Sequence, residues 1–370
     1  MNSCFKTNRH KEFPINFEPR CLPTTLGSLP LTDAAQATAL LLAYTPEIPA
    51  WVQLPKRAWH ENMMVQYLEG LPGIVEENER AYFDTSQPDY QDALTDFFAR
   101  YLAVESGDEA ALETFAITPR RSTGFPALME ALPKLSTPPV MAKGQVTGPF
   151  TWGTTLTDQN RRCVYYDDQL HDVIVKGVAL KALWQIKHLK SSGAPAMLWM
   201  DEPSLLGFGS STFISISRQD VLRDLNEVAA AIHAESALTG VHCEANTDWS
   251  LLMEADLDIL DFDAYDHLEA ITLYPDELRA FFERGGSLGW GIVPTLNPEA
   301  AATETVESLL ARFDAGVARL EAKGFARDLL LRRALVTPSC GAGTLTPRLA
   351  ERVLGLLRDL ANTLRKREGF

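Results

Sequence analysis

Cysteine is scarce in this sequence, and its few cysteines do not form the pattern of a disulfide-stabilised protein. There are five in 370 residues, which is an odd number, and they are widely spaced. They are Cys4, Cys21, Cys163, Cys243 and Cys340. In a chain of this length, such spacing is typical of free thiols in a reducing compartment. We therefore predict a cytoplasmic protein without structural disulfides.

Basic residues and long apolar runs are also lacking. Lysine and arginine number 34 against 49 acidic residues, which gives a formal net charge of −15. This excess of negative charge argues against a nucleic-acid-binding surface and against binding to anionic lipids. No apolar run approaches the roughly 18–20 residues of a membrane span, and segment 1–20 lacks the apolar core of a signal peptide. The sequence thus predicts a soluble protein with neither nucleic acid nor membrane as a partner.

What the sequence does contain is an alternation of short apolar runs and amphipathic segments. Eight runs have the length and composition of buried strands: 22–26, 50–54, 140–146, 196–200, 239–243, 258–262, 287–293 and 334–337. Apolar residues at helical spacing predict helices between the later runs, for example at 167–191 and 218–235. This alternation predicts an α/β fold, a (β/α)8 TIM barrel that forms a single domain over 21–370. Residues 1–20 are expected to be loosely ordered, as chain ends often are.

The connection between the second and third predicted strands is too long for an ordinary barrel loop. It contains helical stretches, such as 61–68 and 90–104, separated by proline-rich breaks. We interpret residues 56–138 as a long helical insertion after strand 2. We expect it to pack over the barrel rather than to form an independent domain.

Side chains that bind metals gather where the predicted strands end. His242, Cys243 and Glu244 close the fifth strand. Asp263 follows the sixth strand, and Cys340 follows the eighth. Successive strand residues face opposite sides, so His242 and Glu244 share a face while Cys243 points the other way. Because the C-terminal ends of barrel strands meet at one rim, these groups can hold zinc, whose catalytic sites use about three protein ligands. We predict His242, Glu244, Asp263 and Cys340 as ligands, with Cys243 as an alternative.

Each candidate residue also has a purely structural interpretation. His242 could be a hydrogen-bonded core histidine, and Cys340 could be a small buried hydrophobic residue. Asp263 could cap the helix that follows it. The run 201–203 (Asp-Glu-Pro) could lie at a helix N-terminus, where the dipole favours acidic residues. The pair Gly27-Ser28 could be only a turn.

Several short segments carry a resemblance to a known family through their order along the chain. They are TTLGS at 24–28, NMMVQY at 62–67, VTGP at 146–149, DEP at 201–203, the segment around His242, and SCG at 339–341. Together they resemble the catalytic barrel of cobalamin-independent methionine synthase and its relatives. That superfamily also contains uroporphyrinogen decarboxylase and corrinoid-linked methyltransferases. The resemblance covers the barrel segments from about residue 23 to residue 340.

The resemblance implies a zinc ion that binds a thiol substrate, which is homocysteine in the type enzyme. In the family, the metal is held by a His-x-Cys pair, a carboxylate from the next strand and a cysteine near the C-terminus. His242 and Cys340 match the histidine and the C-terminal cysteine, and Asp263 falls where the family has glutamate. Glu244 stands where the family has the other cysteine, with Cys243 one position earlier. Because of this difference from the family, it is open whether the site has a second thiolate ligand.

The resemblance also implies a substrate site and a set of functional hypotheses. The Gly27-Ser28 turn matches the segment whose backbone binds the amino acid's carboxylate, and Asp201 matches the acid that holds its amino group. The first hypothesis is a zinc-dependent methyltransferase that forms methionine, with a methyl-folate or a methyl-corrinoid protein as donor. His242, Asp201 and Cys340 would be its catalytic residues. The alternatives are a porphyrinogen decarboxylase-type enzyme and a non-catalytic, ligand-binding relative with a degenerate metal site.

Overall fold

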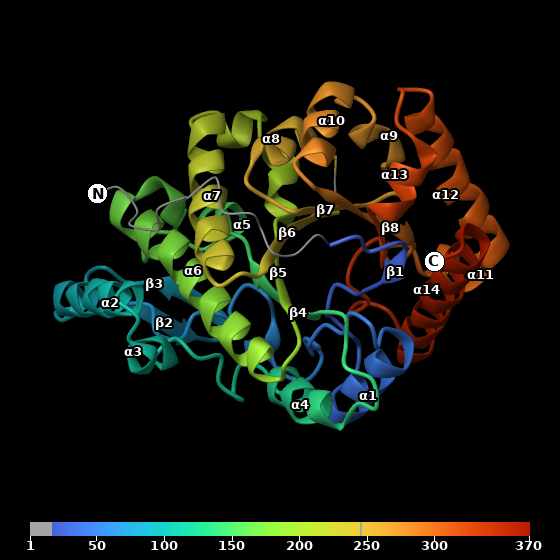
Figure 1. The fold of residues 1–370 in the computed structure, drawn as a ribbon. Helices are drawn as coiled ribbons and strands as arrows, with labels where there is room; N and C mark the ends of the chain where they lie inside the picture. The colour runs from blue at the N-terminus through green and yellow to red at the C-terminus, as the bar shows by residue number, and fades with distance from the viewer. Residues whose placement is uncertain (1–16, 245) are drawn as a thin grey trace.

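The main sheet of this protein is parallel and strongly curled. The computed structural model describes residues 17–244 and 246–370, so most of the predicted loose segment 1–20 lies outside the described residues. The strands of this sheet are β1 (Leu22–Pro23), β4 (Ala142–Thr147), β5 (Ala196–Asp201), β6 (Leu238–Cys243), β7 (Ile259–Phe262), β8 (Ser287–Val293) and β9 (Ala334–Pro338). They pair in the order β1-β9-β8-β7-β6-β5-β4. Figure 1 shows them curving around a common centre, as half of a barrel.

The structure corrects the prediction of a closed eight-stranded barrel. The predicted second strand, 50–54, forms only isolated parallel bridges, from Gln53 to Ser28 and from Ala50 to Lys143. It therefore lies between the chain after β1 and β4 without becoming a strand of the sheet. Pro49 and Pro55 flank this segment, and a proline has no backbone N–H to extend a ladder. What the structure shows is a mixed α/β fold with a seven-stranded half-barrel.

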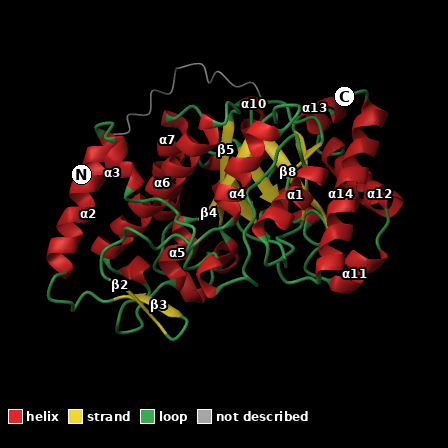
Figure 2. Cartoon of the chain, turned by 90° about the horizontal axis from the view of Figure 1, so that it is seen from below, coloured by secondary structure: helices red, strands yellow, loops and turns green. Residues whose placement is uncertain are grey.

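Helices cover the outer face of the curled sheet (Figure 2). They are α1 (Ala34–Tyr44), α5 (Pro149–Thr155), α6 (Asp168–Ser191), α7 (Arg218–Ala234), α8 (Trp249–Glu254), α9 (Leu268–Ile271), α10 (Pro275–Glu283), α11 (Pro298–Thr303), α12 (Val306–Glu321), α13 (Arg327–Arg332) and α14 (Pro347–Glu368). Their ends follow ordinary capping chemistry. Asp167 caps α6, Ser217 and Asp220 form a capping box on α7, and Thr346 caps α14. Local sequence signals therefore fix where these helices begin.

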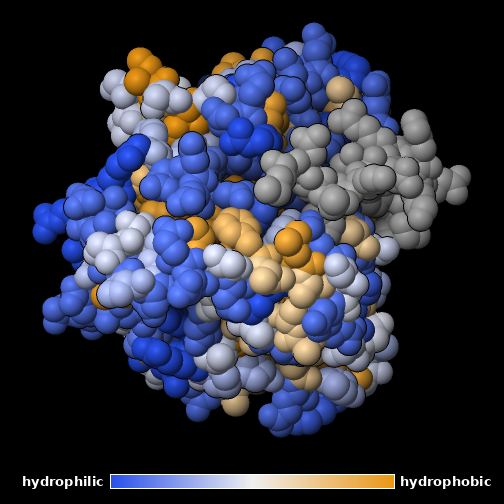
Figure 3. All heavy atoms as spheres, turned by 90° about the vertical axis from the view of Figure 1, so that its left-hand side faces the viewer, coloured by the Kyte–Doolittle hydropathy of each residue, from blue (hydrophilic) through white to orange (hydrophobic). Residues whose placement is uncertain are grey.

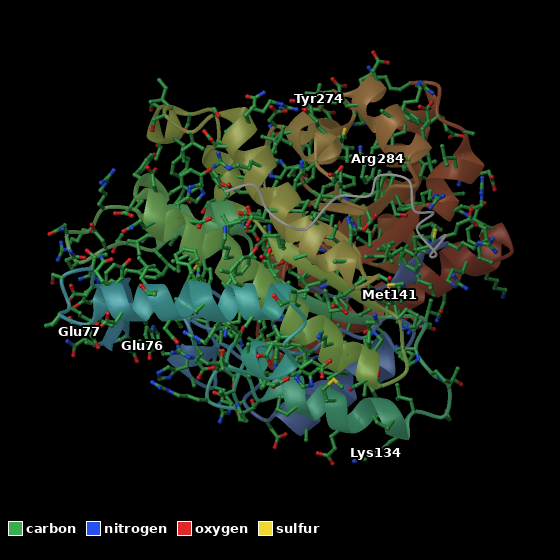
Figure 4. The ribbon with its side chains drawn as sticks, turned by 60° about the vertical axis from the view of Figure 1, so that its left-hand side comes forward. Glu76, Glu77, Lys134, Met141, Tyr274 and Arg284 are labelled. Carbon is green, nitrogen blue, oxygen red and sulfur yellow. The ribbon has the colours of Figure 1, made fainter. Side chains whose placement is uncertain are left out.

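The segment between the second predicted strand and β4 contains helices, as predicted, but also a β-hairpin. The helices are α2 (Tyr90–Glu105), α3 (Glu109–Glu113) and α4 (Gly124–Ala131), and the hairpin consists of β2 (Ile74–Glu77) and β3 (Arg80–Phe83). Asn78 and Glu79 both have positive φ, 50° and 55°, as a two-residue hairpin turn of type I′ requires. Figure 4 shows Glu76 and Glu77 of this hairpin far from Tyr274 and Arg284.

The two faces of the sheet have different chemistry. In register, Asp201 lies opposite His242 and His242 lies opposite Asp261, so all three side chains share the inner face. Deeper on this face is a small apolar cluster, which includes Met197, Trp199, Leu238, Ile259 and Leu335. The polar residues follow it toward the C-terminal strand ends. The fold thus gathers acidic and imidazole groups at one end of an apolar interior.

The outer surface differs from the interior in polarity. The face in Figure 3 is mostly hydrophilic, with apolar residues in a limited band, which agrees with the chain's charged fraction of 22%. Among the described residues, no helix is both long enough and apolar enough to cross a membrane.

Candidate metal centre

His242, Glu244 and Cys340 form a compact group at the C-terminal ends of β6 and β9. One ligand atom from each residue lies within 4.8 Å of the other two. His242 is buried, while Glu244 and Cys340 are partly exposed. The Cys340 thiol donates a hydrogen bond to a carboxylate oxygen of Glu244. Strands distant in sequence thus bring together a nitrogen, an oxygen and a sulfur ligand, a combination that suits zinc.

His242 is oriented by a second carboxylate. Its Nδ1 donates to Oδ2 of Asp261 at 2.7 Å, and Thr337 Oγ1 donates to the other oxygen of Asp261 at 2.6 Å. Nε2 of His242 is buried and has no hydrogen-bond partner among the described residues. Because a carboxylate only accepts, it fixes the proton on Nδ1 and leaves Nε2 available as a ligand. This is the outer-shell arrangement typical of metal-binding histidines.

The place of Asp261 depends on a glycine in the neighbouring strand. Gly289 lies opposite Asp261 in the β7–β8 register. A Cβ atom at position 289 would lie 2.1 Å from Oδ1 of Asp261 and 2.8 Å from its Cβ. Only glycine therefore leaves room for this carboxylate beneath His242.

The pKa values of His242 and Cys340 are shifted so that a cation bound by this group would displace protons. Burial by itself lowers the pKa of His242, but Asp261 and the neighbouring Cys340 outweigh it and hold the pKa well above its usual value. Burial raises the pKa of the Cys340 thiol, and His242 opposes this effect. Without a cation the group therefore retains protons, and a metal ion that binds there would release them.

Cys243, the alternative ligand predicted from the sequence, lies on the other side of the sheet. Its register partner is Phe262, it is fully buried, and it belongs to the large apolar cluster between sheet and helices. The group that could hold a metal contains Glu244 rather than Cys243. The alternation of side chains along β6 accounts for this difference.

Replacing Cys243 by serine is expected to leave zinc affinity within about twofold of the wild type, while burial of a hydroxyl lowers stability by about 1–3 kcal/mol. Competition with a chromogenic chelator measures the affinity, and denaturant unfolding measures the stability. Loss of zinc binding in a folded Cys243→Ser protein would identify Cys243 as a ligand.

Asp263 lies outside the three-residue group. Its Oδ1 accepts hydrogen bonds from the backbone N–H groups of Tyr265 at 2.8 Å and Asp266 at 2.9 Å. Its Oδ2 is buried and has no partner among the described residues. Burial raises the pKa of this carboxyl to about 6. Oδ1 of Asp263 thus caps a turn, in line with the structural interpretation. Oδ2 is still available to bind a ligand.

Asp201 and Glu202 have separate roles although they are adjacent. Glu202 is fully buried and accepts hydrogen bonds from the backbone N–H groups of Phe150 at 3.0 Å and Thr151 at 2.7 Å, at the start of α5. Asp201 instead lies beside His242 on the inner face, with 8% of its surface exposed. Burial raises the pKa of Asp201 to about 6, although His242 and Lys143 oppose the shift. Glu202 therefore caps a helix, whereas Asp201 remains available for a role next to His242.

The Gly27-Ser28 turn packs against the loop that carries Cys340. Gly27 has a φ of +90°, a conformation that favours glycine. The N–H of Gly343 donates to Ser28 Oγ at 3.3 Å, and the N–H of Ala342 donates to the Ser28 carbonyl at 3.0 Å. Both residues of the turn line a small cavity together with Cys340. The turn and the thiol predicted to serve one site are therefore close in space.

Sequence reasoning missed Asp261 and Thr337. Asp261 is the third residue of β7, inside an apolar run, and Thr337 is the fourth residue of β9. The signal that could have found Asp261 is the alternation within β7, which separates it from its apolar neighbours Leu260 and Phe262. Its contact with His242 becomes visible only once β6 and β7 are paired.

No protein-family model matches the chain, and no curated protein matches it. The function is therefore inferred from the site itself and from the motifs of the sequence.

Proposed function

We propose that this chain is a zinc-dependent methyltransferase that transfers a methyl group to a thiol substrate such as homocysteine, giving methionine. The observation that carries the proposal is the group of His242, Glu244 and Cys340, in which the buried Nε2 of His242 has no hydrogen-bond partner within the described part of the chain. Three ligands of these types fit zinc and leave a fourth position for a substrate. When bound there, zinc would keep a coordinated thiol deprotonated near neutral pH.

The chain's own residues would hold and orient the substrate. Asp201 would bind the ammonium group of an amino acid; its place on the inner face next to His242 supports this role. The backbone of the Gly27-Ser28 turn would bind the substrate's carboxylate. Asp261 would keep Nε2 of His242 directed toward Glu244 and Cys340. Such positioning raises the rate by holding the substrate sulfur where it can attack a methyl group.

The methyl donor is either a methyl-folate or a methyl-corrinoid protein. In both cases a sulfur–carbon bond forms, and the carbon–nitrogen or carbon–cobalt bond of the donor breaks. The test is to incubate the zinc-loaded protein with homocysteine and each donor, and to quantify methionine by mass spectrometry. We expect methionine with one donor and none from the His242→Ala variant. A zinc-loaded protein that forms no methionine with either donor would overturn the proposed activity.

A ligand-binding protein without catalysis is the second candidate, because Glu244 stands where the family that the sequence resembles has a thiolate. A carboxylate donates less charge to a metal than a thiolate does, and this would weaken activation of a bound thiol. The two candidates differ in a simple way: a binding protein takes up homocysteine in the presence of zinc but transfers no methyl group. Isothermal titration with and without zinc, followed by the methyl-transfer assay, separates them.

Zinc is expected to protect Cys340 from alkylation. At a zinc concentration about 100 times the dissociation constant, about 1% of the sites are free, so modification should slow by about a hundredfold. Peptide mass spectrometry after timed exposure to iodoacetamide measures this rate. Cys163, which is partly exposed and lies outside the group, serves as the internal control and should react at the same rate with and without zinc. Equal protection of both cysteines would count against ligation by Cys340.

A further inference from the structure

The loop that carries Cys340 is held by hydrogen bonds that continue the pairing of β8 and β9 beyond both strand ends. β8 ends at Val293 and β9 ends at Pro338, and these two residues are register partners. The N–H of Ser339 then donates to the carbonyl of Val293 at 2.8 Å. Pro294 and Pro338 have no N–H to donate, so the backbone alone cannot extend this ladder. Side chains therefore have to hold the loop from here on.

Thr295 and Ser339 form a pair of buried hydroxyls beside Cys340. The two residues are 0% and 2% exposed. The N–H of Thr295 donates to Ser339 Oγ at 3.1 Å, and the two hydroxyl oxygens lie 3.2 Å apart. Thr295 Oγ1 donates to the carbonyl oxygen of Cys340 at 3.0 Å. Thr295 thus binds the backbone of a predicted metal ligand directly.

The protons of this hydroxyl pair follow from its contacts. A hydroxyl has one proton to donate, and a carbonyl oxygen only accepts. Thr295 gives its proton to the carbonyl of Cys340, so Ser339 donates the bond between the two hydroxyls. Ser339 Oγ in turn accepts from the N–H of Thr295. Loss of the Thr295 hydroxyl would leave both the Cys340 carbonyl and the Ser339 hydroxyl without this partner.

Ser28 holds the same loop from its other side. The N–H of Ala342 donates to the Ser28 carbonyl at 3.0 Å, and the N–H of Gly343 donates to Ser28 Oγ at 3.3 Å. These contacts fix the residues that follow Cys340, whereas Thr295 fixes Cys340 itself. The backbone around the thiol is therefore held between β8 and the turn that contains Ser28.

We propose that Thr295 is a positioning residue of the metal centre. Its hydroxyl fixes the carbonyl of Cys340, so that Sγ of Cys340 is directed toward Glu244 and His242. The thiol donates a hydrogen bond to a carboxylate oxygen of Glu244, and ligand atoms of the three residues lie within 4.8 Å of one another. A loop that is already fixed in its binding conformation loses less conformational freedom when the ligand binds. For its effect on zinc affinity the inference rests on the proposed function, whereas the position of the thiol can be tested without any metal.

The test compares Thr295→Val with Thr295→Ser. Valine keeps the shape of threonine but lacks the hydroxyl, and serine keeps the hydroxyl. We expect Thr295→Val to lower zinc affinity by at least about tenfold, as for other outer-shell partners of metal sites, and Thr295→Ser to restore most of the affinity. Chelator competition measures the affinity, and thermal unfolding checks that each variant is folded. Wild-type affinity in folded Thr295→Val, or equal weakness of the serine variant, would overturn the role of Thr295.

Thr45→Val is the matched control for loss of a buried hydroxyl. Thr45 is also 0% exposed, and its hydroxyl donates to the carbonyl of Leu41 at 3.1 Å, at the end of α1. The variant loses the same kind of hydrogen bond outside the metal group, so its stability should fall while its zinc affinity stays that of the wild type. An equal loss of zinc affinity in Thr45→Val and Thr295→Val would show a general effect of destabilisation and would overturn the proposed role.

Ser339→Ala supplies the measurement if Thr295→Val does not fold. This variant removes the other hydroxyl of the pair and leaves the N–H of Thr295 without its acceptor. Zinc affinity should fall here as well, because Thr295 loses the group that orients its hydroxyl. Wild-type affinity in folded Ser339→Ala would then count against the hydroxyl pair and overturn the inference.

The metal-free protein separates this inference from the proposed function. If the wild type binds no zinc, the proposed function is wrong, and alkylation of Cys340 by iodoacetamide still decides the role of Thr295. Cys340 should react faster in Thr295→Val than in the wild type, because its loop is released, while Cys163 reacts at one rate in both. An unchanged rate at Cys340 would then overturn the inference. If the wild type binds zinc and Thr295→Val binds it equally well, the proposed function stands and the role of Thr295 is wrong.

Discussion

Replacing Cys340 by serine is expected to remove tight zinc binding and, with it, any methyl transfer. A serine hydroxyl is a poor zinc ligand near neutral pH, whereas a cysteine binds as a thiolate. The loss should exceed the roughly 10–100-fold that removal of an outer-shell partner costs, because a direct ligand is lost. Only His242 and Glu244 of the three-residue group would remain.

The matched control for this variant is Cys163→Ser. Cys163 is partly exposed and lies next to η3 (Val164–Tyr166), outside the metal group. Chelator competition gives the zinc dissociation constant of both variants, and thermal unfolding checks that each is folded. The control should match the wild type. A folded Cys340→Ser protein with wild-type zinc affinity would show that Cys340 is not a ligand.

The second large effect is expected for Asp261→Asn. A carboxylate can only accept from His242, whereas an asparagine amide can donate to Nδ1 and move the ring proton to Nε2. Nε2 would then no longer be available as a ligand. Zinc affinity should fall by about 10–100-fold, although asparagine differs from aspartate only by an amide NH2 in place of one carboxylate oxygen. The hydrogen bond from Thr337 to the other oxygen of Asp261 should keep the amide in place.

Asp263→Asn is the matched control for Asp261→Asn. Asp263 is two residues away, carries the same carboxylate and is also buried, but it caps a turn and lies outside the group. Its amide variant should bind zinc more tightly than Asp261→Asn does. Nitrogen-15 spectra of His242 report in both proteins which ring nitrogens carry a proton. If Asp263→Asn has the larger effect on zinc affinity and Nδ1 of His242 stays protonated in Asp261→Asn, Asp263 is a ligand and the proposed role of Asp261 is wrong.

Sequence alone predicted the elements whose signals are local. His242 and Cys340 follow apolar runs, and because strand ends meet at one rim, their convergence could be anticipated. The helices predicted at 167–191 and 218–235 likewise correspond to α6 and α7, because apolar residues at helical spacing are a local signal. At these positions the apolar spacing and the neighbouring residue types indicate the same element, so the prediction does not require knowing which distant segments pair.

Features that depend on pairing between distant segments could not be predicted in the same way. The apolar run 50–54 has strand-like composition, but its flanking prolines reduce it to isolated bridges. Asp261 lies within an apolar run of the sequence. Its role becomes evident only from its contact with His242 on β6. The choice between the two candidate ligands after His242, by contrast, follows from the alternation along β6, which directs Cys243 toward the helices.

The metal content of the native protein shows whether His242, Glu244 and Cys340 hold zinc. Purification in zinc-supplemented buffer, followed by elemental analysis and X-ray absorption at the zinc edge, should show about one zinc ion per chain, with one sulfur among nitrogen and oxygen ligands. Addition of homocysteine should raise the sulfur count to two. A folded wild-type protein that remains free of metal under these conditions would contradict the proposed zinc site.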